Sequence, residues 1–217
     1  MKIALIGAGA AGAACVSVLR SRRADFCIFE KSRGVGGRLC TRRVSDALPS
    51  HTLLYDHGCP SFKVGETLNS FITSDLSLNS LRQISSELWV SAPTMPHFIK
   101  ELLGASQLHT QCEIDAIEGQ PGAWFLTEKS RGNAEAPRRF GPFEKIVITA
   151  PAPQALNLLR NTEHSWAAPL NSVKYSPCWV LLISVQSDTP VGFSASSIFS
   201  SISNQESKPE RTTQPSI

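Results

Sequence analysis

Three glycines near the start of the chain are spaced so that they could hold a phosphate group. Gly7, Gly9 and Gly12 form a G-x-G-x-x-G run. In such a run the first glycine permits a tight turn, the second lets the backbone approach a pyrophosphate, and the third lets a helix pack against a strand. Amide groups at the helix start add hydrogen-bond donors and partial positive charge. The predicted contact residues are Gly7, Ala8, Gly9, Ala10, Ala11 and Gly12.

One acid follows at a distance that suits an adenosine-binding carboxylate. Glu30 lies 21 positions after Gly9, and the usual offset is about 20 residues. A carboxylate at this place can accept hydrogen bonds from ribose hydroxyls and would repel a 2′-phosphate. The pattern therefore favours an unphosphorylated adenosine dinucleotide, FAD or NAD, over a glycine-rich helix start that binds no ligand.

A second glycine-rich segment begins directly after the acid. It reads KSRGVGGR from Lys31 to Arg38, which is too rich in glycine for a helix. Arginine suits phosphate because its planar guanidinium group can donate two parallel hydrogen bonds. Gly37 and Arg38 are the predicted phosphate contacts, with Lys31 beside the acid. A flavin dinucleotide bound in an extended pose could use this second turn, which a plain NAD-dependent dehydrogenase does not need.

The elements that must position these residues alternate between strand and helix. Apolar residues over Lys2–Ile6 and Phe26–Phe29 predict two buried parallel strands, and Ala13–Leu19 predicts the helix between them. Phe143–Ala150 predicts a further parallel strand, which Pro151 ends. Ligands bind at the carboxyl ends of strands in open α/β sheets, so Ala150 is expected to face the same cofactor. The sequence therefore predicts an α/β fold.

The middle and end of the chain give weaker patterns. Residues Ser61–Ser91 carry helical spacing of apolar residues, which suits a small inserted subdomain. The remaining predicted elements are a strand at Leu53–Tyr55, a strand or turn at Trp89–Met95, a helix at Pro96–Leu103, strands at Gln107–Ile117 and Ala123–Glu128, a helix at Ala155–Arg160 and a strand at Cys178–Val185. Residues 186–217 are rich in Ser, Pro, Thr and Gln, which predicts disorder.

The Asp56-His57-Gly58 tripeptide contains the one histidine that invites a catalytic interpretation. A histidine between an aspartate and a glycine is more often a hydrogen-bonded turn residue than a general base, and we predict no catalytic side chain. Gly58 is the more informative position, because a residue without a Cβ lets the backbone lie close to a flat ring system. We therefore count Gly58 among the predicted cofactor contacts.

Composition and charge restrict the class of protein. A net charge of +3, with no basic stripe interleaved with aromatic residues, favours a local anion site over nucleic acid binding. Six cysteines lie without a C-x-x-C pair, which predicts reduced thiols, no metal site and a cytoplasmic location. The glycines inside the N-terminal apolar run argue against a signal peptide. No apolar run approaches the roughly 20 residues of a membrane helix.

Several of these segments together resemble one flavoprotein family. The segments IALIGAGAAG, FEKSRGVGGRLCTRR, YDHG, WVSAPTMPHFIKELL, ITAPAPQALNLL and VKYSPCWVLL are similar to the renalase branch of the FAD-dependent, amine-oxidase-like flavoproteins. The resemblance covers roughly residues 1 to 185. It implies a doubly wound FAD domain of the p-hydroxybenzoate-hydroxylase kind, at residues 1–64 and 92–160. A mixed substrate domain, at 65–91 and 161–185, is implied to be incomplete.

The resemblance also implies a chemistry and further contacts. Members of this branch look like oxidases that transfer hydride from dihydronicotinamide dinucleotides or amines to the flavin and then to oxygen. The strand around Cys112 and Glu113 would contact adenine through its backbone, and Ala150 with Pro151 would pass near the flavin's linker. The flavin itself accepts the hydride, so no protein acid or base is required.

Two departures from the family leave other functions open. After Gly58 the chain reads CPSFK where the family has a stretch of the A-Q-Y-F-T kind, so the substrate side of the flavin is expected to differ. The family's C-terminal third has no counterpart after Val185. The alternative is therefore a truncated, inactive fragment that at most binds an adenine dinucleotide. An NAD-dependent dehydrogenase is disfavoured, because the chain has no Tyr-x-x-x-Lys pair.

Overall fold

A four-stranded parallel sheet carries the N-terminal glycine run. The computed structural model describes residues 2–45, 52–65, 78–130, 136–162, 165 and 167–182. The strand order of the parallel sheet is β12-β1-β2-β8. The strands are β1 (Lys2–Ile6), β2 (Asp25–Phe29), β8 (Leu108–His109) and β12 (Lys145–Ile148). Helix α1 (Ala10–Ser21) connects β1 to β2. This parallel sheet with its connecting helix is a Rossmann-like fold, which confirms the predicted α/β class.

The chain divides into two compact units. The first unit comprises Met1–Gly37 and Leu102–Pro177, and the second comprises Arg38–Glu101 and Cys178–Ile217. These are structural divisions, and the division into an FAD domain and a substrate domain stays a prediction. The predicted disordered tail at 186–217 lies outside the described residues.

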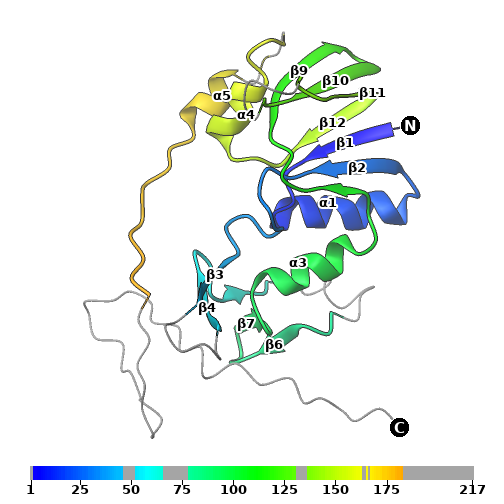
Figure 1. Ribbon diagram of the computed structural model, residues 1–217. Helices are drawn as coiled ribbons and strands as arrows, with labels where there is room; N and C mark the ends of the chain where they lie inside the picture. The colour runs from blue at the N-terminus through cyan, green and yellow to red at the C-terminus, as the bar shows by residue number, and fades with distance from the viewer. Residues whose placement is uncertain are drawn as a thin grey trace, which may run out of the picture. The chain divides into compact units, whose positions relative to one another are not determined.

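An antiparallel sheet completes the first unit. Its strands are β9 (Ile114–Gln120), β10 (Ala123–Glu128) and β11 (Arg139–Phe143), in the order β11-β10-β9. Figure 1 shows α1 along one side of the parallel sheet and β9 to β11 on the other. Two short helices follow, α4 (Ala152–Leu158) and α5 (Ala167–Ser172).

The core of the first unit lies between its sheets. Phe29 is 1% exposed and packs against Phe140 and Phe143 at centroid distances of 4.9 and 6.0 Å, while His109 stacks on it at 5.1 Å. Aromatic pairs at such distances stabilise a core beyond the area that they bury. The cluster contains Ala4, Ile6, Cys27, Phe29, Cys112, Ile114, Ile117, Leu126, Phe143 and Leu158. This packing fixes the end of β2, which Glu30 follows directly.

The second unit contains a hairpin and a small antiparallel sheet. Strands β3 (Cys40–Ser45) and β4 (Thr52–His57) pair along their whole length. Strands β5 (Phe62–Lys63), β6 (Leu81–Gln83) and β7 (Leu88–Ser91) have the order β5-β7-β6. Helix α3 (Pro96–Leu103) follows β7 with the predicted bounds, and residues 96 to 101 belong to this unit.

The structure differs from the sequence predictions in several elements. Helical spacing between 61 and 91 was misleading, because β5, β6 and β7 occupy its described ends, and 66–77 lie outside the description. Periodicity cannot separate short apolar strands from helix segments. The strand predicted at Gln107–Ile117 is two strands, and Gln111 between them has a φ of 53°. Strand β3 was not predicted, and residues 178–182 form no strand.

Arg20, in the last turn of α1, binds the C-terminal end of α3 at Leu102 and Leu103, which belong to the first unit. Its guanidinium group donates hydrogen bonds to the carbonyl oxygens of Leu102 and Leu103, and to Ser106 Oγ at 3.0 Å. A cation is favourable at the C-terminal carbonyls of a helix. We expect Arg20→Ala to lower the free energy of unfolding by about 1–2 kcal/mol. Urea denaturation measures this, and the exposed Arg22→Ala should change it by less than about 0.5 kcal/mol.

Candidate functional site

The first glycine turn lies at the carboxyl end of β1, where the sheet order changes direction. From β1 the chain proceeds through α1 to β2 on one side, while β12 pairs with β1 on the other. Such a switch point leaves a crevice beyond the strand ends, and ligands of open α/β sheets bind there. Gly7 and Ala150 follow the neighbouring ends of two paired strands, because β1 ends at Ile6 and β12 at Ile148.

The glycines of the first turn are needed for different reasons. Gly7 has a φ of +107°, and a Cβ there would lie 2.6 Å from Thr149 Oγ1. A Cβ on Gly12 would collide with the carbonyl oxygen of Gly7. A Cβ on Gly9 would meet no described atom closer than 3.9 Å. Packing within the chain therefore requires glycine at 7 and 12, whereas the space beside Gly9 is open.

Thr149 holds the turn and was not among the residues predicted from the sequence. Its amide donates to the carbonyl oxygen of Ile6 at 2.9 Å, and its hydroxyl lies 3.0 and 3.1 Å from the carbonyl oxygens of Ile6 and Gly7. The threonine therefore ties the carboxyl end of β12 to the start of the turn. Only the parallel pairing of β12 with β1 brings residues so distant in sequence together.

Helix α1 presents its N-terminus to this crevice. Gly9 is its N-cap, and among the described residues no side chain caps it and no acid occupies its first turn. Ala10 and Ala11 are exposed, and the first helical hydrogen bond runs from the Ala13 amide to the Gly9 carbonyl oxygen at 2.9 Å. Helix N-termini carry amides without intrahelical partners and attract anions.

The second glycine turn lies against the first. The Gly36 amide donates to the Ala8 carbonyl oxygen at 2.9 Å, and Gly9 and Gly36 form an isolated parallel bridge. Gly37 has a φ of +58°, and a Cβ there would lie 3.5 Å from Gly9 Cα. The two turns, adjacent to the N-terminus of α1, thus form a surface of bare backbone. The residues fit a ligand that approaches the main chain closely.

Glu30 follows β2 and is turned toward the backbone. Its side chain is buried, with the residue 6% exposed, and its Oε2 accepts a hydrogen bond from the Ala8 amide at 2.9 Å. Its Oε1 accepts another from the Ser32 amide at 2.8 Å. The carboxylate therefore joins the first turn to the start of the second. Each carboxylate oxygen still has capacity for a further donor, such as a ribose hydroxyl.

The segment around Cys112 runs beside Glu30. The Cys112 amide donates to the Glu30 carbonyl oxygen at 2.9 Å, and the Gln111 amide donates to the Ser32 carbonyl oxygen at 2.9 Å. The Cys112 side chain is 1% exposed and belongs to the core, so Cys112 itself can face a ligand only through its backbone.

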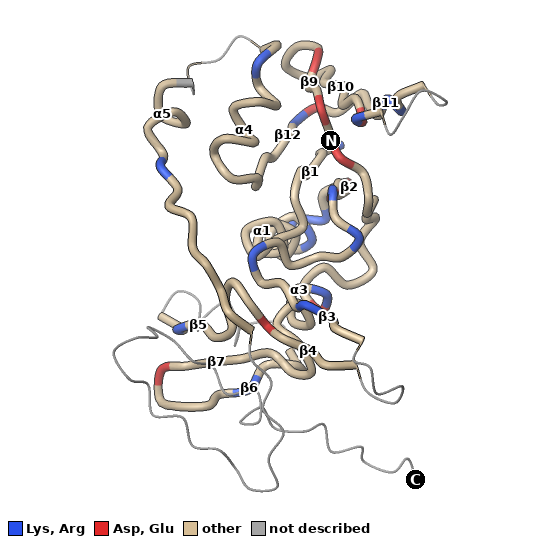
Figure 2. The backbone as a smooth tube through the Cα atoms, turned by 60° about the vertical axis from the view of Figure 1, so that its left-hand side comes forward, with Lys and Arg blue, Asp and Glu red and all other residues tan. Residues whose placement is uncertain are grey.

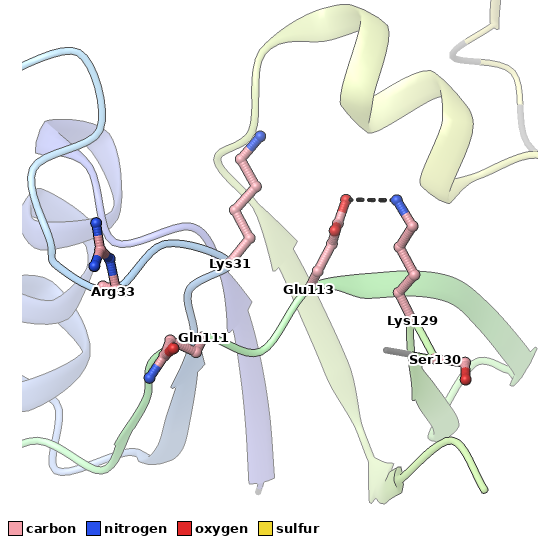
Figure 3. A pocket seen from close by; sticks show the side chains of 6 residues that line it. All are labelled: Lys31, Arg33, Gln111, Glu113, Lys129 and Ser130. Atoms are coloured by element: carbon pink, nitrogen blue, oxygen red, sulfur yellow. Dashed lines mark hydrogen bonds and ion pairs between the residues drawn. The ribbon is translucent and has the colours of Figure 1, made fainter. Parts of the chain in front are cut away.

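A polar pocket of about 270 Å³ opens next to this segment. It is lined by Lys31, Arg33, Gln111, Glu113, Lys129 and Ser130 (Figure 3). Lys129 forms an ion pair with Glu113 at 3.4 Å. Three cations and one acid line the pocket, which favours an anionic ligand. Basic and acidic residues otherwise both occur on the elements of this unit (Figure 2).

Two predicted contacts belong to the second unit. Arg38 is exposed and begins that unit, directly after Gly37. Gly58 has a φ of +86°, and a Cβ there would lie 2.5 Å from the Arg38 carbonyl oxygen. The structure thus gives Gly58 a packing reason of its own. His57, the considered general base, ends β4 and faces Cys40 across the hairpin.

Comparisons with known proteins agree with this fold. Residues 5–72 match the model of the NAD(P)-binding Rossmann-like domain family. The structure of THI4 from Thermovibrio ammonificans is similar over 74% of this chain and 62% of its own, at 12% identity and a TM-score of 0.50. A protein from Exiguobacterium sp. 255-15, assigned as a protoporphyrinogen oxidase, is similar over 79% of this chain and 63% of its own, at 10% identity and a TM-score of 0.50.

These comparisons show a Rossmann-like fold. The chain spans about three fifths of the length of both solved structures. At these identities the likeness concerns the fold. Of the helices that the structure describes, none combines the length and apolar character that a membrane crossing requires.

Proposed function

We propose that the first unit binds FAD and that the protein is an FAD-dependent oxidoreductase of the renalase-like, amine-oxidase-like kind. The contact between two glycine turns, at the N-terminus of α1, is the observation that carries this proposal. A single glycine turn suffices for many dinucleotides. A second turn that packs on the first supplies more bare backbone for an extended flavin dinucleotide.

The proposed contacts follow from the positions of the residues. The pyrophosphate would lie against Gly9 and the free amides at the start of α1, where a Cβ has open space. The adenosine ribose would donate to Glu30, with Lys31 and the Cys112 backbone bordering the adenine. Arg38 would reach the phosphates from the second turn. The proposed contacts are Gly7, Ala8, Gly9, Ala10, Ala11, Gly12, Glu30, Lys31, Gly37, Arg38, Gly58, Cys112 and Ala150.

The bound flavin would supply hydride acceptance, which protein side chains cannot provide. The substrates proposed are dihydronicotinamide dinucleotides or amines, with oxygen as the acceptor. The chain's own residues would bind and orient the cofactor. Glu30 would contact the ribose and the first glycine turn together, and the backbone amides at the start of α1 would stabilise the phosphate charge by hydrogen bonding. No side chain is assigned a proton transfer.

Flavin binding and turnover are tested separately. After FAD is added, the full chain should show absorption bands at about 370 and 450 nm, and these bands should persist through gel filtration. Peroxide release with dihydronicotinamide isomers and with amines then tests the reaction. Flavin retention without peroxide would favour an inactive dinucleotide-binding fragment, and a colourless protein would contradict the proposal.

Gly9→Ala separates ligand binding from folding. A Cβ at this position fits the unliganded chain, and Gly9 has φ −84° and ψ −170°, which alanine can adopt. We expect the free energy of unfolding to fall by no more than about 1 kcal/mol, mainly because alanine is a weaker N-cap than glycine. The affinity for FAD should fall at least about tenfold, or 1.4 kcal/mol, because the methyl group would occupy the proposed phosphate position.

The measurement is a flavin fluorescence titration, with thermal unfolding in parallel. Gly34→Ala is the matched control, since a Cβ there meets no described atom within 4 Å and Gly34 is not a proposed contact. Equal affinity in the Gly9 and Gly34 variants would exclude Gly9 from the cofactor site.

A further inference from the structure

Cys40 and His57 face each other across the β3–β4 hairpin, within the second unit. They are directly opposed in the antiparallel register. The Cys40 sulfur lies 3.4 Å from Nε2 and 3.6 Å from Nδ1 of His57. Both residues are half-buried, so a small reagent can reach them. The hairpin thus sets a nucleophile beside a base, outside the proposed catalytic chemistry.

This arrangement suits activation of the thiol. A thiol is a better nucleophile when a neighbouring base accepts its proton. Both ring nitrogens lie at nearly equal distances from the sulfur, so either tautomer of the imidazole can offer an acceptor. The Cys40 thiol also lies 3.6 Å from the His57 carbonyl oxygen, which is a weaker proton acceptor than the ring.

Charges around the pair divide between the two faces of the hairpin. Side chains alternate along a strand, so Arg42 shares the face of Cys40, while Arg43 shares that of Thr41. On that other face Asp56 accepts hydrogen bonds from the Thr41 hydroxyl and, at 3.1 Å, from the Met95 amide. Within residues 40–45 and 52–57, the described part of the hairpin, the Asp56 carboxylate is therefore engaged on the face opposite to His57. On the face of Cys40, Arg42 supplies a cation that attracts anionic reagents such as glutathione disulfide.

The remaining cysteines have different surroundings. Cys27 and Cys112 are buried, and Cys15 is half-buried. Burial raises the pKa of the Cys59 thiol, which donates to the Ser61 carbonyl oxygen at 3.1 Å. Cys178 is exposed and lies 3.7 Å from the Trp179 carbonyl oxygen. Cys178 therefore serves as a reference for an accessible thiol, and Cys59 for one that is held protonated.

We propose that Cys40 is a modification site for low-molecular-weight disulfides, with His57 as its base. His57 takes the proton from the Cys40 thiol, and the sulfur attacks one sulfur of the disulfide. A new S–S bond forms between Cys40 and that half of the reagent as the original S–S bond breaks. The other half leaves as a thiolate and receives the proton from the imidazolium. Cys40 is thereby oxidised and the leaving half is reduced.

The experiment measures how fast each cysteine reacts in the full chain. The protein is pulsed with glutathione disulfide at fixed neutral pH, quenched with acid and mapped by peptide mass spectrometry. Cys40 should form the mixed disulfide at least about fivefold faster than Cys178, although Cys178 is more exposed. His57→Asn should lower the Cys40 rate at least about fivefold and leave the Cys178 rate unchanged.

A matched pair of arginine variants provides the control. Arg42→Gln should slow the reaction of Cys40, whereas Arg43→Gln, on the other face, should not. The proposal is overturned if Cys178 reacts faster than Cys40 in the unaltered chain, or if His57→Asn leaves the Cys40 rate unchanged. Circular dichroism verifies the fold of each variant. If His57→Asn does not fold, the rate order in the unaltered chain together with the arginine pair decides.

Discussion

Replacing Gly12 by alanine is expected to destabilise the protein by about 2–4 kcal/mol, because the added Cβ would collide with the Gly7 carbonyl oxygen. That oxygen belongs to the backbone of a turn that Thr149 holds through its own hydrogen bonds. Neither group can move without separating α1 from β1 or breaking the contact with β12. Urea denaturation of the purified variant measures the loss.

The control for Gly12→Ala is Gly34→Ala, in the second glycine turn. Position 34 is exposed, and among described atoms its Cβ would have open space. We expect a change within about 0.5 kcal/mol there. Similar unfolding midpoints for the two variants would show that α1 does not pack on the turn as described. Because the readout is unfolding without cofactor, it is independent of what the site binds.

Replacing Glu30 by alanine is expected to cost about 2–4 kcal/mol of stability in the absence of any cofactor. The carboxylate is buried and accepts hydrogen bonds from the Ala8 and Ser32 amides. Its removal leaves two backbone donors without this acceptor, and each unsatisfied donor costs about 1–3 kcal/mol. Glu30→Gln should also destabilise the chain, because the amide nitrogen would face one of these N–H groups.

The control for Glu30 is Glu118→Gln, at an exposed position in β9. Its neutralisation should change the free energy of unfolding by less than about 0.5 kcal/mol. An equal effect of both substitutions would mean that Glu30 does not hold the two turns together. Flavin titration of Glu30→Gln then tests the proposed ribose contact, whose weakening should lower the affinity for FAD.

The two turns show how a short sequence motif becomes an ordered backbone surface. Glu30 and the Gly36 amide both attach to the residue between the first two glycines, Ala8. The chain thereby organises its backbone before a ligand arrives. Preorganisation of this kind lowers the ordering cost of binding, which suits the proposed cofactor.

The sequence determined the elements whose signals are local. The apolar run before Gly7, the alanine-rich helix after it and the acid after the second strand depend on neighbours within a few residues. For this reason β1, α3 and β10 were predicted with the observed bounds, and α1 and β2 with small errors at their ends. The Rossmann-like fold follows from the alternation of these strands and helices.

Tertiary structure decided what depends on distant partners. Thr149 reaches Gly7 only because β12 pairs with β1, and Cys40 meets His57 only through the register of a hairpin whose first strand had no clear pattern. Residues 178–182 are apolar but form no strand, because a strand needs a neighbouring strand to pair its backbone groups. Local composition specifies a conformation when the hydrogen bonds of that conformation join residues that are close in sequence. Pairings across many residues depend on how the whole chain packs.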